Sequence, residues 1–234
     1  VFPGLRGAPG GAILSVAANL FDLTGPADRL TASLTEARSK VLIGQIKTID
    51  PAYQFESLGT PATLEGQINQ INELRLDRAA AFYRVRGETR PLQVETLRYL
   101  QRNVDAAYAE GLRRLDAGRL DIRLSPREAL GNFIDCRVRD NLRELYNQLG
   151  IPSRQGQVRV IGREYDTSGS DRTYRIPDAR VGSVAFDMTL TRKTLRTAQV
   201  RGFFNSDFKP TSVVIVRPSQ LGPDNTYIIT RPGN

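Results

Sequence analysis

The stretch SPREALGNFIDCRVRDNLRELYNQLGIP, residues 125–152, marks the point where the chain changes from helical to strand-rich sequence. It opens with Ser125-Pro126-Arg127-Glu128, in which a capping Ser precedes a Pro at the first helical position and a Glu three residues after the cap. Apolar side chains recur at helical spacing from Leu130 to Leu149, and Gly150-Ile151-Pro152 is a stop signal. The sequence predicts an amphipathic helix over residues 126–149.

Upstream of this helix the apolar spacing is also helical. It predicts helices over about 28–46, from Thr63 to Phe82 and from Pro91 to Leu115. Downstream, short β-branched runs bounded by Gly, Pro, Asp and Ser predict strands at 157–163, 173–176, 183–191, 212–217 and 226–230, with a short helix over 195–204. We expect an α+β fold with two parts, a helical region over 1–124 and a mixed sheet within 125–234.

The composition excludes several kinds of site. The chain has 234 residues, no His and a single cysteine, Cys136. Catalysis by Ser-His-Asp or Cys-His, and zinc bound by His, are therefore excluded, whereas carboxylate and hard-metal chemistry remains open. One cysteine cannot close an intramolecular disulfide, so we expect a reducing compartment or a fold that needs no such bond, with Cys136 as a small buried side chain.

The charge is concentrated in the second part of the chain. Residues 125–234 hold 17 Lys and Arg against 11 Asp and Glu, whereas residues 1–124 hold 16 against 14. An Arg-rich part suits a polyanionic partner, although a solvated Arg-rich surface explains it equally well. No run reaches the length of a membrane span, since Gly10 to Leu23 is broken by polar residues. The start at Val1 without a signal-peptide pattern indicates a fragment of a longer precursor.

Two carboxylates are brought close by a predicted hairpin. Asp178 ends one expected strand and Asp187 lies within the next, with only Ala179 to Ala185 between them. Carboxylates on neighbouring strand ends can hold Mg²⁺, which can activate water and stabilise the leaving oxygen of a phosphodiester. The alternative is a set of structural salt bridges to Arg175, Arg180 or Arg192.

The same residues resemble a known family. The segments YRIPD (174–178), FDMT (186–189) and LRTAQVRGF (195–203) are similar to the motifs of the toxin branch of the PD-(D/E)XK restriction-endonuclease-like superfamily. In these domains an Ile-Pro-Asp precedes a strand bearing Glu-x-Lys, and a helix with a Thr-x-Gln-x-Arg-x-Phe pattern follows. The resemblance covers roughly residues 125–234 and implies a restriction-endonuclease-like α-β-β-β-α-β core.

Carried over residue by residue, the resemblance implies a metal-dependent site. Asp178 matches the Pro-Asp metal ligand, Asp187 the acidic member of the (D/E)-x-K pair and Gln199 the helix glutamine. An acidic residue of the first helix often completes the family's site; Asp135 is our choice, with Glu128 and Glu144 as alternatives. The implied cofactor is Mg²⁺ or Mn²⁺.

The sequence departs from the family at Thr189, which stands where the family has Lys. Thr189 carries no positive charge to orient water or steady a pentavalent phosphate. Lys193 is the nearest lysine, but six residues of strand span about 20 Å. It therefore reaches the site only if the chain bends sharply after Thr191. Arg180 or Arg192 could substitute as electrostatic clamps, although Arg is too basic to act as a base.

The leading hypothesis is a metal-dependent nuclease, cutting DNA in preference to RNA, with Lys193 and Gln199 positioning water or phosphate. The resemblance implies the toxic C-terminal tip of a secreted antibacterial effector that acts in the cytoplasm of a target cell. Residues 1–124 would then serve delivery, packing against a carrier or binding of an immunity protein. The residues expected to contact nucleic acid are Arg175, Arg180, Arg192, Arg196 and Arg201.

Two other hypotheses remain open. One is a metal-independent ribonuclease or nucleotide-modifying toxin, which would use Tyr165, Tyr174, Arg175, Lys193 and Arg196. The other is a nuclease-like scaffold that has lost catalysis and only binds nucleic acid or a protein. Cleavage in the presence and absence of metal separates them.

Overall fold

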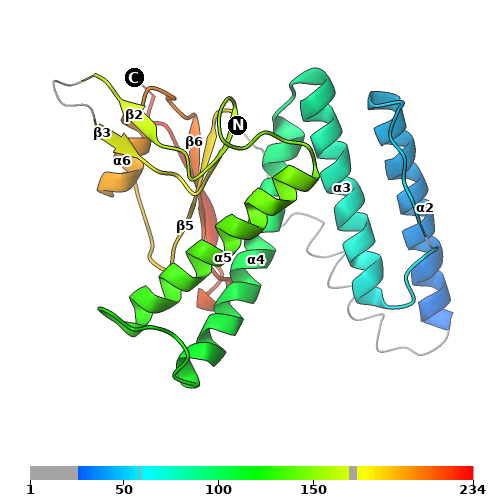
Figure 1. The fold of residues 1–234 in the computed structure, drawn as a ribbon, viewed down its shortest axis with the longest axis horizontal. Coiled ribbons are helices and arrows are strands. Elements are labelled where there is room, and N and C mark those ends of the chain that lie inside the picture. The colour runs from blue at the N-terminus through cyan, green and yellow to red at the C-terminus, as the bar shows by residue number, and fades with distance from the viewer. Residues whose placement is uncertain (1–25, 58, 169–172, 234) are drawn as a thin grey trace. The chain divides into compact units, whose positions relative to one another are not determined.

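The structure is a computed structural model that describes residues 26–57, 59–168 and 173–233 (Figure 1). The chain forms two compact units, Val1–Ala81 and Phe82–Asn234. Among the described residues there are five helices and a mixed sheet of five strands. No described helix is long and apolar enough to cross a membrane, and the Gly10–Leu23 stretch lies outside the described residues.

The first unit contains α2 (Pro26–Ile49) and most of α3 (Leu64–Arg86). Thr35 of α2 donates a hydrogen bond to Gln67 of α3, and Ser39, one turn later in α2, accepts one from Gln70, which is one turn later in α3. The two helices therefore run in the same direction. Apolar side chains are buried within the unit, among them Leu42, Ile46 and Leu74.

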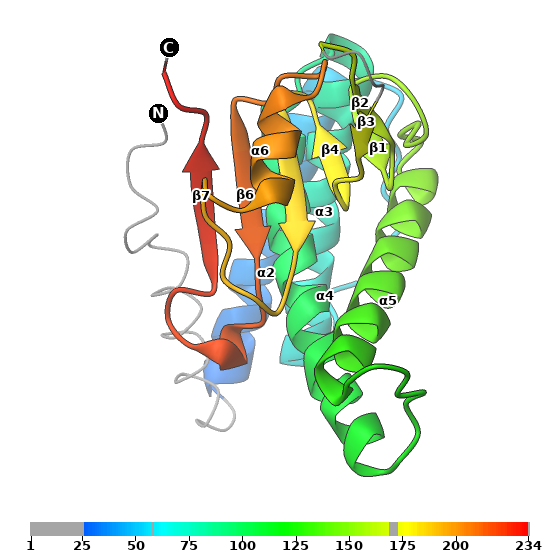
Figure 2. The ribbon, with the colours of Figure 1, turned by 90° about the vertical axis from the view of Figure 1, so that its left-hand side faces the viewer.

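In the second unit, α4 (Arg90–Asp116) and α5 (Pro126–Gln148) pack side by side. The predicted N-cap begins α5, because Ser125 Oγ accepts a hydrogen bond from the Glu128 backbone N–H at 3.1 Å. The second bond of the predicted capping box is not formed: Glu128 Oε1 accepts from Asn132, and Oε2 has no hydrogen-bond partner. Between the helices, the hydroxyls of Thr96 and Tyr146 form a buried hydrogen bond of 2.7 Å. This pair of helices covers one face of the sheet (Figure 2).

The sheet has the strand order β1-β4-β5-β6-β7. Its strands are β1 (Val158–Val160), β4 (Ala179–Val181), β5 (Val184–Met188), β6 (Ser212–Val216) and β7 (Thr226–Thr230). Only the β5–β6 pair is parallel. A two-residue turn joins β4 to β5, and Gly182 suits it because its φ is +56° and a Cβ there would lie 2.5 Å from Thr89 Oγ1.

The parallel pair is connected by α6 (Ala198–Asn205), which covers the opposite face of the sheet from α4 and α5 (Figure 2). Val200, Phe203 and Phe204 of α6 join Ala185, Val213, Ile215 and Ile229 of the strands in one buried cluster. Beside α6, β2 (Glu164–Asp166) and β3 (Thr173–Arg175) form a separate two-stranded sheet.

The predicted helices and strands are all present, with shifted ends, but β2 and β4 were not predicted. The expectation that Asp178 ends a strand was wrong, because Asp178 directly precedes β4 and the strand before it ends at Arg175. The expectation of a buried Cys136 was also wrong. Ile134 and Val138 face the core, and Cys136 lies about 200° around the helix from each of them, which points it to solvent.

The boundary between the compact units falls at Ala81 and Phe82, whereas the sequence suggested a division at 124 and 125. The difference concerns α4, which packs against α5, β5 and β6. The roles expected for residues 1–124 and 125–234 stay predictions.

Candidate functional site

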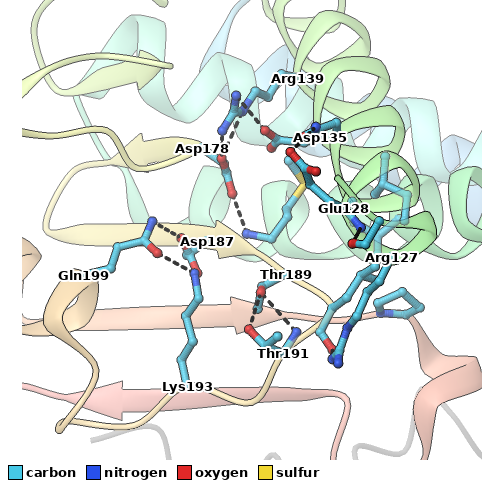
Figure 3. A pocket seen from close by; sticks show the side chains of 18 residues that line it. Arg127, Glu128, Asp135, Arg139, Asp178, Asp187, Thr189, Thr191, Lys193 and Gln199 are labelled. Atoms are coloured by element: carbon cyan, nitrogen blue, oxygen red, sulfur yellow. Dashed lines mark hydrogen bonds and ion pairs between the residues drawn. The ribbon is translucent and has the colours of Figure 1, made fainter. Parts of the chain in front are cut away.

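A pocket of about 430 Å³ lies in the second unit, and residues of α5, β5, α6 and the β5–α6 connection contribute to its wall. Figure 3 shows its labelled side chains. All of the expected metal and catalytic residues line it: Asp135, Asp178, Asp187, Lys193 and Gln199. The structure thus brings together residues from five separate segments of the chain.

Asp187, Lys193 and Gln199 form a closed hydrogen-bonded triangle (Figure 3). Lys193 Nζ donates to Asp187 Oδ2 and to Gln199 Oε1, both at 2.6 Å. Gln199 Nε2 donates to Asp187 Oδ1 at 2.9 Å. The Asp187 side chain is only 2% exposed and that of Lys193 13%, so the ion pair is shielded from solvent.

Thr189 begins the bend that brings Lys193 back to this site. β5 ends at Met188, and Thr189 Oγ1 then accepts a hydrogen bond from the Thr191 backbone N–H at 3.1 Å, which turns the chain. If the strand continued, six residues of extended chain would place Lys193 about 20 Å from Asp187. Because β5 ends at Met188, Lys193 is not carried that far away. The chain thus bends between Thr189 and Thr191, earlier than the bend after Thr191 that the sequence required, and Lys193 reaches the site.

On the α5 side of the pocket, Arg139 joins two carboxylates (Figure 3). Its Nη1 pairs with Asp135 Oδ2 at 2.7 Å, while Nε donates to Asp178 Oδ1 at 2.9 Å and Nη2 bonds the same oxygen. The other oxygen of Asp178 accepts the Met188 backbone N–H. Arg139 was not among the residues expected in the site, although its position four residues after Asp135 on a helix is the spacing of an ion pair.

Two carboxylates of the pocket, Asp135 and Asp187, have raised pKa values. Burial, followed by the charge of Asp178, raises the pKa of Asp135 to about 7, and Arg139 offsets only part of this. Burial and the charge of Asp178 likewise raise the pKa of Asp187 to about 6, against the opposing effect of Lys193. Burial is the larger cause in both cases, and the charges of Arg139 and Lys193 offset only part of the rise.

The donor chemistry of the pocket fits a hard divalent cation. Asp135 Oδ1 and Glu128 Oε2 are buried carboxylate oxygens without a hydrogen-bond partner. In the part of the chain that the structure describes, no three His, Cys, Asp or Glu side chains gather in a group that could hold a metal ion. Mg²⁺, however, is usually bound through one or two carboxylates and keeps several waters. Asp178 and Asp187 line the pocket with Asp135, and both oxygens of each accept hydrogen bonds from protein groups.

The arginines expected to contact nucleic acid differ in their availability. Arg180 pairs with the buried Glu164 at 3.0 Å and lies over the Phe208 ring, 4.1 Å from its centroid, so its role is structural. Arg192 is 67% exposed and lies 3.8 Å from Asp224. Three others are exposed, of which Arg196 is near Lys193 in the chain, Arg175 is in β3 and Arg201 is in α6.

Residues of the alternative hypotheses are not gathered in the pocket. Tyr165 and Tyr174 pair across the β2–β3 sheet with their rings at 5.9 Å, and neither they nor Arg175 line the pocket with Lys193. Glu144 is exposed on α5 and accepts a hydrogen bond from Gln148. Glu128, the other alternative on α5, lines the pocket, and its backbone N–H also takes part in the helix cap.

Arg127 lines the pocket and was not among the expected site residues. Its exposed guanidinium donates to the Leu190 carbonyl at 3.1 Å. In the sequence Arg127 is simply the second residue of a helix, and nothing there indicates that it lines a pocket.

Comparison with protein-family models, with curated proteins and with solved structures found no match to this chain.

Proposed function

We propose that this pocket is the active site of a metal-dependent nuclease of the PD-(D/E)XK type, which cuts DNA in preference to RNA. The observation that carries the proposal is the bonding of Lys193 Nζ to Asp187 and Gln199 in the pocket that also holds Asp178. The family has a lysine where this chain has Thr189, and Lys193, four residues further along, would take its place. The carboxylates, the ammonium group and the amide of such a site are then all present.

Asp178 and Asp187 would hold Mg²⁺ or Mn²⁺, with Asp135 completing the set. When bound, the ion supplies Lewis-acid stabilisation of the charge that develops on the phosphate oxygens. The raised pKa values of Asp135 and Asp187 are compatible with this assignment: burial is their main cause and the charge of Asp178 the second, and a bound cation would stabilise the charged form of both carboxylates.

Lys193 takes the part that a lysine plays in phosphodiester hydrolysis. An ammonium group has three N–H donors, and the bonds to Asp187 and Gln199 use two of them. The remaining donor can orient the attacking water or bond a phosphate oxygen. Gln199 holds both charged partners at once and so fixes the direction in which that donor points.

Phosphate groups flanking the scissile bond would meet arginines. Arg127 lines the pocket, and Arg192 and Arg196 are exposed on either side of Lys193 in the chain. Guanidinium groups bind phosphate through two parallel hydrogen bonds, which suits a polyanionic substrate. Arg180 is left out of this interface because Glu164 holds it.

The biological setting proposed for the chain rests on the resemblance alone. It is the toxic C-terminal tip of a secreted effector, acting in the cytoplasm of a target bacterium and held inactive in the producing cell by an immunity protein. The helical residues upstream would serve delivery or bind that protein.

One observation favours a second candidate, a metal-independent reaction. Arg139 and Lys193 already pair with Asp178 and Asp187, so these carboxylates have counter-charges without a metal. A binding module without catalysis is the remaining alternative.

The test is cleavage of supercoiled plasmid and of total RNA by the purified chain in Mg²⁺, in Mn²⁺ and in excess EDTA. Lys193→Ala should lower the rate by about 10²–10³-fold, the effect of removing one transition-state donor. Lys47→Ala, which removes an exposed lysine of α2, is the matched control and should cleave normally. Equal cleavage in EDTA would favour the metal-independent candidate. Salt-dependent binding without cleavage would favour the binding module.

A further inference from the structure

Tyr227 lies in the same cross-strand row as Asp187. Asp187 of β5 is the partner of Ile215 in β6, and Ile215 is the partner of Tyr227 in β7. Partners in register on adjacent strands point to the same face of a sheet. Ile215 belongs to the buried cluster under α6, and Tyr227 packs against that cluster. The ring of Tyr227 is therefore fixed on the face from which Lys193 and Gln199 approach Asp187.

The hydroxyl of Tyr227 binds the backbone of Lys193 twice. It accepts a hydrogen bond from the Lys193 backbone N–H at 2.7 Å and donates one to the Lys193 carbonyl oxygen at 2.8 Å. The donor and one acceptor position of the hydroxyl are both used by a single residue. Two bonds to the N–H and the C=O of one residue fix both the orientation of the Lys193 backbone and its distance from β7.

Lys193 needs an anchor of this kind because of where it lies. The connection from Thr189 to Thr197 contains neither helix nor strand, so no regular ladder of backbone hydrogen bonds holds it. The lysine side chain adds four rotatable bonds between this backbone and Nζ. A displaced Cα would draw Nζ away from its 2.6 Å contacts with Asp187 and Gln199 or force the side chain into another rotamer.

We propose that Tyr227 is a positioning residue that holds Lys193 in the site through these two backbone bonds. The kinetic part of this inference rests on the proposed nuclease function, whereas the anchoring itself does not. Tyr227→Phe is the informative variant, because it keeps the ring packed on the cluster and removes only the hydroxyl. Tyr99→Phe is the matched control, since the Tyr99 hydroxyl donates to the Asn141 carbonyl at 3.1 Å, away from the pocket.

The first two readouts need no activity. Acetylation of Lys193 Nζ, followed by mass spectrometry with the exposed Lys47 as internal reference, reports how firmly the ammonium is held. Deuterium uptake of the 189–197 peptide reports the Lys193 amide. Both should be about fivefold faster in Tyr227→Phe, the factor that a hydrogen bond of about 1 kcal/mol corresponds to, and unchanged in Tyr99→Phe. Unchanged rates in Tyr227→Phe would overturn the inference.

The third readout is cleavage under the conditions in which the wild-type chain is active. A displaced Lys193 should lower kcat by about 10-fold or more, with KM changed little, because misplacement of a catalytic group acts on the transition state. Faster labelling with an unaltered kcat would show that Tyr227 anchors the Lys193 backbone without affecting catalysis. It would overturn the positioning role proposed for Tyr227. If the wild-type chain cleaves nothing while labelling responds as expected, the nuclease proposal fails and the anchor stands.

Discussion

Arg139 is the residue that pairs with both Asp135 and Asp178 in the pocket. Its guanidinium bonds Asp178 Oδ1, and the Asp178 side chain is 4% exposed. Removing one partner of a shielded pair leaves the other charge without compensation, which is costly. We expect Arg139→Gln to lower the free energy of unfolding in EDTA by about 2 kcal/mol. Added Mg²⁺ should recover more stability in this variant than in the wild type. Urea unfolding with EDTA or Mg²⁺ measures both.

Arg137→Gln is the control for that prediction. Arg137 lies on the same helix and pairs with Glu110 at 3.0 Å, but its side chain is 45% exposed. An exposed pair contributes at most about 1 kcal/mol. Equal losses in the two variants, or a Mg²⁺ response in Arg139→Gln no larger than in the wild type, would contradict the role assigned to Arg139.

The sequence could name Asp178, Asp187 and Gln199 because each sits in a short motif. It could not decide whether Lys193 reaches them, because that depends on Thr189 turning the chain and on a hydroxyl from β7 that is distant in sequence. Arg139 had a local signal, its spacing from Asp135, but the second partner Asp178 is 39 residues away. Apart from the local turn at Thr189, what the sequence left open is a contact between remote segments.

At the scale of the element, the start of α5 sets the position of the acidic wall of the pocket. Ser125 caps the helix through Glu128 N, and Glu128 and Asp135 follow within its first three turns. We expect Ser125→Ala to lower the free energy of unfolding by about 1 kcal/mol, as the loss of a capping oxygen does. Thr89, at the corresponding position of α4, makes no side-chain cap bond. Thr89→Ala should thus cost clearly less in the same denaturant titration, and equal costs would contradict the role given to the cap.

Helices and longer strands were predictable because their apolar spacing repeats over several turns or pleats. β2 and β4 have three residues each, and neither lies in a β-branched run of the kind that marked the equally short β1 and β3. Missing β4 also misplaced Asp178, which lies at the start of that strand. Its backbone N–H bonds the Phe186 carbonyl at 3.0 Å, so the β4–β5 hairpin itself holds Asp178 against the end of β5.

At the scale of the whole molecule, α4 joins the helices to the sheet through contacts that cross the expected boundary at 124 and 125. Gln93 donates to the Val181 carbonyl at 3.0 Å, and Gln101 donates to the Arg217 carbonyl at 2.9 Å. Leu92, Leu100 and Val104 of α4 are buried. The sequence of α4 does not identify these partners, because amphipathic spacing indicates that one face of a helix is buried but not which element buries it.

These contacts predict which fragment folds. Removing α4 exposes the surface that covers Leu92, Leu100 and Val104, whose burial contributes about 1.5–3 kcal/mol each, against a total stability of about 5–15 kcal/mol for a domain. We expect residues 82–234 to unfold in one cooperative transition by circular dichroism in urea. Residues 125–234 should show no such transition, and their Tyr146 would lose its Thr96 partner. A cooperative transition of similar midpoint in the shorter fragment would place α4 outside the folding unit and restore the boundary that the sequence suggested.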